Sequence, residues 1–166
     1  MCTKIKSRKM IFDFLLGGNA IFTLENSSTG NRFTFKVTQS PRDHGLFWVK
    51  VLTGPDNQKD YTYFATYYHN WILSETNQGK NPADAWRIKY NPTKGISPKA
   101  QSARTFTWFI QTIHKGDLPE NIIFRHEGKC GRCGRKLTVP ESLDSGFGPE
   151  CINLIHKKQY SHPINL

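Results

Sequence analysis

Residues 32–38 read RFTFKVT, in which apolar Phe and Val alternate with Arg, Thr and Lys. Successive side chains of a β-strand point to opposite faces, so this period predicts a strand with one apolar face and one polar, basic face. Residues 46–52, LFWVKVL, continue the pattern and alternate Trp48 and Lys50 with apolar residues. Together the two stretches predict a sheet whose faces differ in polarity.

Outward from this pair, the chain predicts an antiparallel meander. Segments rich in Gly, Pro, Ser, Asn and Asp separate the strand-like runs, and such short connections favour tight turns between antiparallel neighbours. The meander consists of the runs 19–25, 32–38, 46–52 and 61–67. Two further short strands are predicted at 86–90 and 120–125.

Two helices are predicted. Residues 3–16 mix apolar and basic side chains and end at Gly17, which is typical of a short amphipathic helix. Ser97 and Pro98 are typical of a helix start, and apolar residues then recur at helical spacing as far as Gly116. We expect the apolar stripe of this longer helix to pack on the sheet.

The predicted fold class is α+β, an antiparallel meander packed by one long helix, with a treble-clef-like zinc finger at the C-terminal end. We place the α+β domain at residues 1–119 and the zinc-binding module at 120–166.

The 166-residue chain is strongly basic, with a formal charge of +10. That charge attracts phosphate backbones, anionic surfaces or acidic proteins. No apolar run approaches the ~18–20 residues that span a bilayer, so we expect no membrane-spanning segment. Three of the four cysteines lie within residues 130–151 and the fourth is Cys2, which is a poor framework for disulfides. With no visible secretory signal, we expect a reducing, cytoplasmic setting.

The cysteines have the spacing of a metal site. Cys130 and Cys133 form a CxxC followed by Gly134, which can fold as a zinc knuckle on a tight turn. Cys151 follows GFGPE at a predicted helix start, where the helix dipole and free N–H groups favour a thiolate. A redox pair is the alternative, but it would require the CxxC at the start of a helix in a βαβ unit.

A tetrahedral zinc site needs a fourth ligand. We favour His126, just upstream of the knuckle, over His156 on the predicted helix; His162, Cys2 or a water are the other candidates. With four protein ligands the zinc has no open position, so we expect a structural ion and no hydrolytic chemistry.

The stretches CGRCGRKLTVPES (130–142) and GFGPEC (146–151) resemble a signature shared by an uncharacterised family of phage and mobile-element proteins. The segments 14–24, 29–35 and 52–57 look like the front portion often joined to that module. The resemblance implies a phage or mobile-element origin, hence a host cytoplasm, and a zinc-finger-like end. It also favours His126 as a ligand, because HEGxC commonly precedes the knuckle.

The favoured function is nucleic-acid binding by an accessory protein, because basic groups interleaved with aromatics can hold phosphates while bases stack. The alternative is a protein that binds and inhibits a host defence or nucleic-acid-handling complex, of the anti-restriction or anti-CRISPR type. The candidate nucleic-acid contacts are Arg132, Arg135 and Lys136 at the knuckle, Lys157 and Lys158 after Cys151, and Arg32, Lys36, Lys50 and Trp48 on the sheet.

We do not expect an enzyme. The residues available as catalytic metal ligands are His44, His69, Asp43 and Asp60, and they lie in predicted loops without the spacing of an HNH-type nuclease.

Overall fold

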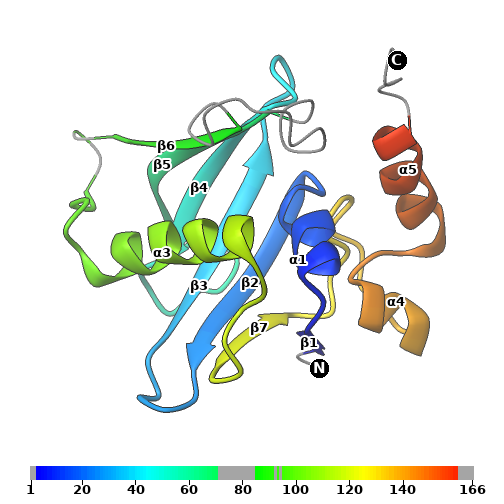
Figure 1. Ribbon diagram of the computed structural model, residues 1–166, viewed down its shortest axis with the longest axis horizontal. Helices are drawn as coiled ribbons and strands as arrows, with labels where there is room; N and C mark the ends of the chain where they lie inside the picture. The colour runs from blue at the N-terminus through cyan, green and yellow to red at the C-terminus, as the bar shows by residue number, and fades with distance from the viewer. Residues whose placement is uncertain (1–2, 71–84, 92, 94, 161–166) are drawn as a thin grey trace.

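The computed structural model describes residues 3–70, 85–91, 93 and 95–160, with the backbone alone for 158–160. These residues form a seven-stranded antiparallel sheet in the order β1-β7-β2-β3-β4-β5-β6 (Figure 1). The strands are β1 (Thr3–Ile5), β2 (Asn19–Asn26), β3 (Arg32–Gln39), β4 (Leu46–Leu52), β5 (Tyr61–His69), β6 (Trp86–Tyr90) and β7 (Ile122–His126). The predicted meander is confirmed as β2 to β5, the separately predicted strand at 86–90 is β6, and the α+β fold class is confirmed with them.

Helices α1 (Arg8–Leu15) and α3 (Gln101–Lys115) lie on one face of the sheet (Figure 1). The apolar stripe of α3 packs on the strands as predicted; the Phe106 ring, for example, lies 5.3 Å from that of Phe35. Nε of Arg8 donates a hydrogen bond to the carbonyl of Ile113 and so joins the two helices. Among the described residues, no helix is long and apolar enough to cross a bilayer.

Both predicted helix starts were wrong. Residues Thr3–Ile5 form β1, which pairs with β7, and α1 begins only at Arg8. Ser97 belongs to a turn, in which its Oγ accepts the N–H of Lys99, and α3 begins at Gln101. A short polar side chain that bonds to its own turn competes with the helix it was expected to cap.

The C-terminal cysteine region is built into the sheet domain. Strand β7, which we assigned to the zinc-binding module, lies between β1 and β2. Short helix α4 (Pro140–Ser145) and helix α5 (Pro149–Tyr160) follow it at that edge of the sheet (Figure 1). A Cβ on Gly131 would lie 2.8 Å from the ring of Phe14, so the cysteine loop fits directly against α1.

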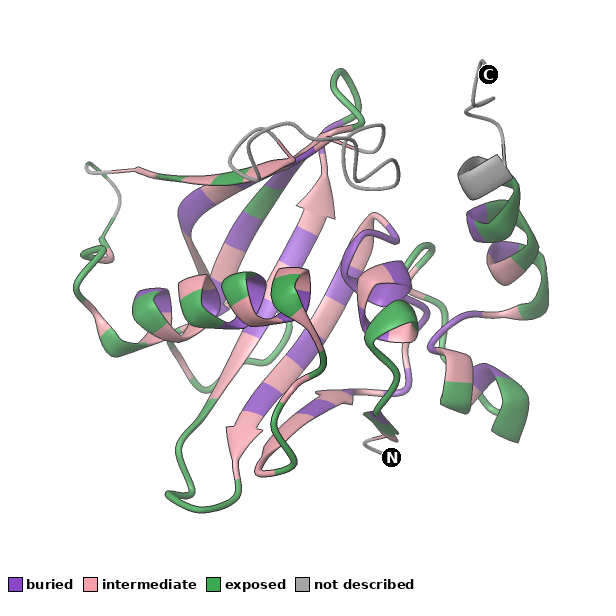
Figure 2. Ribbon diagram, viewed as in Figure 1, coloured by how far each residue is buried: buried purple, intermediate pink, exposed green. Residues whose placement is uncertain are grey.

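The face of the sheet opposite α3 is covered by no helix among the described residues; we call it the open face. Figure 2 shows buried strand residues alternating with half-buried or exposed ones. The basic side chains on the open-face side of this alternation are Lys4, Arg32, Lys36, Lys50, Arg87, Lys89 and Arg125, and the acidic side chain of its strands is Glu25.

Candidate functional site

A hairpin of residues 128–137, the knuckle, carries the first two thiols. The N–H of Leu137 donates to the carbonyl of Gly128 and closes the hairpin at 2.7 Å. Inside it, the N–H of Gly134 donates to the carbonyl of Cys130 at 2.9 Å. Gly134 has a φ of +76°, a left-handed conformation that side chains rarely adopt. The glycine after Cys133 is therefore required by the turn.

Helix α5 supplies the third thiol, because Cys151 lies in its first turn. The thiols of Cys130, Cys133 and Cys151 all lie within 4.8 Å of one another. In a tetrahedral site with Zn–S bonds of about 2.3 Å, sulfurs lie about 3.8 Å apart. The three thiols are thus close to the arrangement a metal ion needs. Cys130 and Cys151 are buried and Cys133 is exposed.

The electrostatics of the three thiols fit a bound cation. Burial raises the pKa of the Cys130 thiol, but backbone N–H groups, that of Cys133 first, outweigh burial and leave it lowered. Burial raises the pKa of the Cys151 thiol. The contact from Nη1 of Arg132, 3.8 Å from Sγ, acts in the opposite direction but does not offset burial. Thiolates this close would repel one another, and a bound cation would offset that repulsion. Thiolate sulfur is a preferred ligand of zinc, and the donor set fits that ion.

The cysteine region is the part of the chain with a known counterpart. Residues 124–156 match a family of unknown function (DUF6011). The matched segment begins in β7, includes the knuckle and α4, and ends within α5, so all three cysteines and His126 lie inside it. No curated protein and no solved structure matches the chain.

The structure does not bring His126 to the thiols. Among the described residues, the group of possible metal ligands contains the three cysteines without His126. Both ring nitrogens are otherwise engaged: Nε2 lies 2.7 Å from the carbonyl of Leu143, and Nδ1 accepts the N–H of Gly128 at 3.0 Å. This pattern fixes a neutral ring with the proton on Nε2, and burial lowers its pKa. His126 therefore ties β7 to α4 and to the start of the knuckle.

Replacing His126 by alanine tests this placement. We expect the variant to bind zinc as the parent does, because the thiols are untouched, and to lose about 2 kcal/mol of unfolding free energy with its two hydrogen bonds. Zinc content by atomic absorption and urea unfolding measure the two effects. Loss of the zinc from a folded variant would instead show that His126 is a ligand.

The other candidate fourth ligands are also outside the thiol group. The exposed His156 lies on α5 but not among the grouped ligand atoms of the described residues. Cys2 and His162 lie outside the described residues. The described residues thus offer three protein ligands, and the closed four-ligand site stays a prediction.

The predicted nucleic-acid contacts of the knuckle, Arg132, Arg135 and Lys136, are exposed, but they are not equivalent. Arg132 contacts Cys151 Sγ and also lines a cavity of about 320 Å³ beside the loop between β3 and β4, with His44 and Ser40. Arg135 and Lys136 are exposed, as is Lys157 on α5. The side chain of Lys158 lies outside the described residues. A change at Arg132 would therefore perturb the metal site as well as any nucleic-acid contact.

On the sheet, the predicted residues Arg32, Lys36 and Trp48 do lie on the open face. Lys36 and Lys50 are direct cross-strand partners of β3 and β4. Sequence reasoning missed Arg87 and Lys89 of β6, although the alternation in WRIKY (86–90) places both on one side.

Two of the four residues weighed for catalysis stabilise turns, and His69 is the last residue of β5 rather than a loop residue as predicted. Oδ1 of Asp43 accepts the N–H of Gly45, and Oδ2 of Asp60 accepts the N–H of Asp56, so both carboxylates stabilise turns. His69 is buried next to Tyr67. Within the described residues, none of them joins a group of possible metal ligands.

Proposed function

We propose that this protein binds nucleic acid on its open face, while a structural zinc ion holds the C-terminal cysteine region against the sheet. In keeping with the resemblance of its cysteine signature, we propose a phage or mobile-element accessory protein.

One observation carries this proposal: Lys36 and Lys50 lie directly opposite each other, and neither forms an ion pair within the described part of the chain. Like charges in direct cross-strand positions destabilise a sheet. A second like-charge pair lies at the sheet edge, where Lys4 is the partner of Arg125, but there Glu25 neutralises Arg125 in an ion pair at 3.0 Å. A polyanion lying over the face would relieve this repulsion, and a phosphate backbone is the polyanion that a chain of net charge +10 attracts.

The zinc site has a supporting role in this proposal. The N–H of Asn19, the first residue of β2, donates to the carbonyl of Gly131 in the knuckle at 2.8 Å. Gly131 in turn donates to the carbonyl of Gly146, just ahead of α5, at 2.9 Å. A metal that fixes the knuckle therefore also fixes the start of a central strand of the binding face.

The proposal predicts that the double variant Lys36→Ala/Lys50→Ala binds nucleic acid at least about 10-fold more weakly at low salt. Each lost phosphate contact also lowers the slope of log affinity against log salt by about 0.7 for a single strand or about 0.9 for a duplex. Fluorescence anisotropy across a salt titration measures both quantities.

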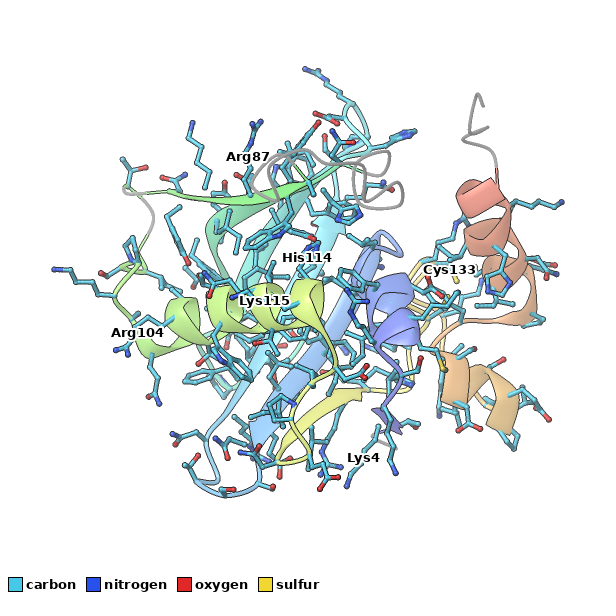
Figure 3. The ribbon with its side chains drawn as sticks, viewed as in Figure 1. Lys4, Arg87, Arg104, His114, Lys115 and Cys133 are labelled. Carbon is cyan, nitrogen blue, oxygen red and sulfur yellow. The ribbon has the colours of Figure 1, made fainter. Side chains whose placement is uncertain are left out.

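The matched control is Arg104→Ala/Lys115→Ala, which removes the same charge from exposed positions on α3, on the helix-covered side (Figure 3). It should bind nearly as the parent does. The lysine variant should be at least as stable as the parent, because it relieves the repulsion across β3 and β4. Equal losses in both variants would show that net charge alone is responsible, and absence of binding at low salt would direct the search to a protein partner.

A further inference from the structure

Resting on the proposed function, we propose that the open face takes single-stranded nucleic acid, with bases stacked on the aromatic side chains of β4 and β5 and phosphates held by the lysines and arginines beside them.

The aromatic side chains gather on one face because of a β-bulge. The register between β4 and β5 shifts between Val49 and Lys50: Lys50 pairs with Tyr63, but Val49 pairs with Ala65. Phe64 is the extra residue, and both Phe64 and Ala65 are buried. In an unbroken strand, Tyr63 and Tyr68 would point to opposite faces, whereas the shift places both on the open face.

Trp48 lies between these tyrosines on the neighbouring strand. Its cross-strand partners are Thr38 on β3 and Thr66 on β5, whose small side chains leave the indole 38% exposed. Tyr68 is two residues beyond Thr66, a step of about 7 Å along a strand. Tyr63, Trp48 and Tyr68 thus follow one another along the direction of β4 and β5, so successive bases of an extended strand can each meet a ring.

Cations flank this aromatic row on both sides. Lys36 and Lys50 lie on the β3 side of Tyr63, and Nζ of Lys36 is 5.7 Å from the ring centre of Tyr61. Arg87 and Lys89 lie on the β6 side, with the guanidinium of Arg87 4.6 Å from the ring centre of Tyr68. Glu25 is already paired with Arg125 at 3.0 Å. A backbone running along β4 and β5 would therefore have phosphate partners at both edges.

The geometry favours a single strand over a duplex. Bases in a duplex are stacked on each other, and proteins reach their edges by inserting a helix or a two-stranded ribbon into a groove. The open face presents instead half-buried or exposed aromatic side chains on a sheet, namely Trp48, Tyr63 and Tyr68. Stacking on such rings strengthens single-strand binding by about 10-fold per base and tolerates any sequence.

The test compares Trp48→Leu with Trp108→Leu. The two indoles are almost equally exposed, 38% and 39%, but Trp108 lies on α3 and so on the other side of the sheet. Anisotropy is measured with labelled single-stranded oligothymidylate, oligouridylate and a mixed-sequence DNA duplex, and thermal unfolding confirms that each variant folds. We expect Trp48→Leu to lose about 10-fold in affinity for single strands, Trp48→Phe to lose less, and Trp108→Leu to lose nothing.

The outcomes distinguish failure of the single-strand assignment from failure of the proposed nucleic-acid binding. Duplex binding as tight as single-strand binding, or equal losses in the two leucine variants, overturns the single-strand assignment while Lys36→Ala/Lys50→Ala can still support nucleic-acid binding. If none of the three probes shows salt-sensitive binding, both the single-strand assignment and the proposed nucleic-acid binding are overturned. The two single-strand probes decide between DNA and RNA within the same assignment.

Discussion

Replacing Cys130 by alanine is expected to remove zinc from the protein and to unfold the segment from the knuckle to α5. Cys130 is buried and its thiol lies within 4.8 Å of those of Cys133 and Cys151, so the variant leaves two thiols that cannot hold the ion alone. Structural zinc contributes about 10–16 kcal/mol to the folding of small finger peptides. A whole domain is stable by only about 5–15 kcal/mol, so this loss is the largest that we expect from one substitution.

The measurements are zinc content, thermal unfolding, and hydrogen exchange over residues 124–156. The parent should hold about one zinc per chain, and its amides in this segment should be protected from hydrogen exchange. The variant should show neither the zinc nor the protection. His156→Ala is the control, since that ring is exposed and outside the thiol group, and it should keep the ion. A parent protein that purifies without zinc and whose unfolding is unchanged by added zinc would contradict the assignment of the site.

The strands were predictable because one physical signal dominates them. Strand β4 lies at the predicted bounds and β3 extends one residue further, since buried residues alternate with half-buried or exposed ones along β4 and over residues 34–38 of β3. Strand β1 has three residues and no such period. It exists because β7, more than a hundred residues later, pairs with it, and no local pattern records that pairing.

In the candidate site too, features set by local sequence were predictable and features set by distant contacts were not. The thiols were predictable from spacing, because CxxC with a following glycine is a local turn. The position of His126 was not predictable, because its ring is hydrogen-bonded to the carbonyl of Leu143 on α4, a helix that sequence reasoning did not predict. The bulge at Phe64 was hidden as well: YTYFATYYH (61–69) breaks its alternation in the middle, and only the register with β4 shows which rings share a face.

A second large effect is expected from acid. The hydroxyl of Tyr67 lies 3.0 Å from Nδ1 of His69 and 2.8 Å from Nε2 of His114, under the helix-covered face. Burial lowers the pKa of His69 to about 4. Burial first, then the charges of His69 and Arg8, lower that of His114 to about 3. In the neutral state the hydroxyl donates to one ring and accepts from the other, whereas two protonated rings would both offer it a proton.

Both histidines bind protons less readily in the folded protein than at their ordinary pKa of about 6.5. The unfolded chain therefore takes up more protons as the pH falls below 6.5, and stability is lost progressively toward the folded pKa of about 4 at His69. From His69 alone, the free energy of unfolding should be about 2 kcal/mol smaller at pH 5 than at pH 7. His114 and His126, whose pKa values are also lowered by burial, act in the same direction.

Urea unfolding at pH 7 and pH 5 checks the size of this effect, and two variants check its origin. His69→Gln should be less stable than the parent at pH 7, because the contact with Tyr67 changes, yet it should lose less stability on going to pH 5. His44→Gln removes an exposed histidine from the loop between β3 and β4 and should keep the full pH dependence of the parent. If His69→Gln and His44→Gln showed the same pH dependence, the acid sensitivity would have to arise from groups other than His69.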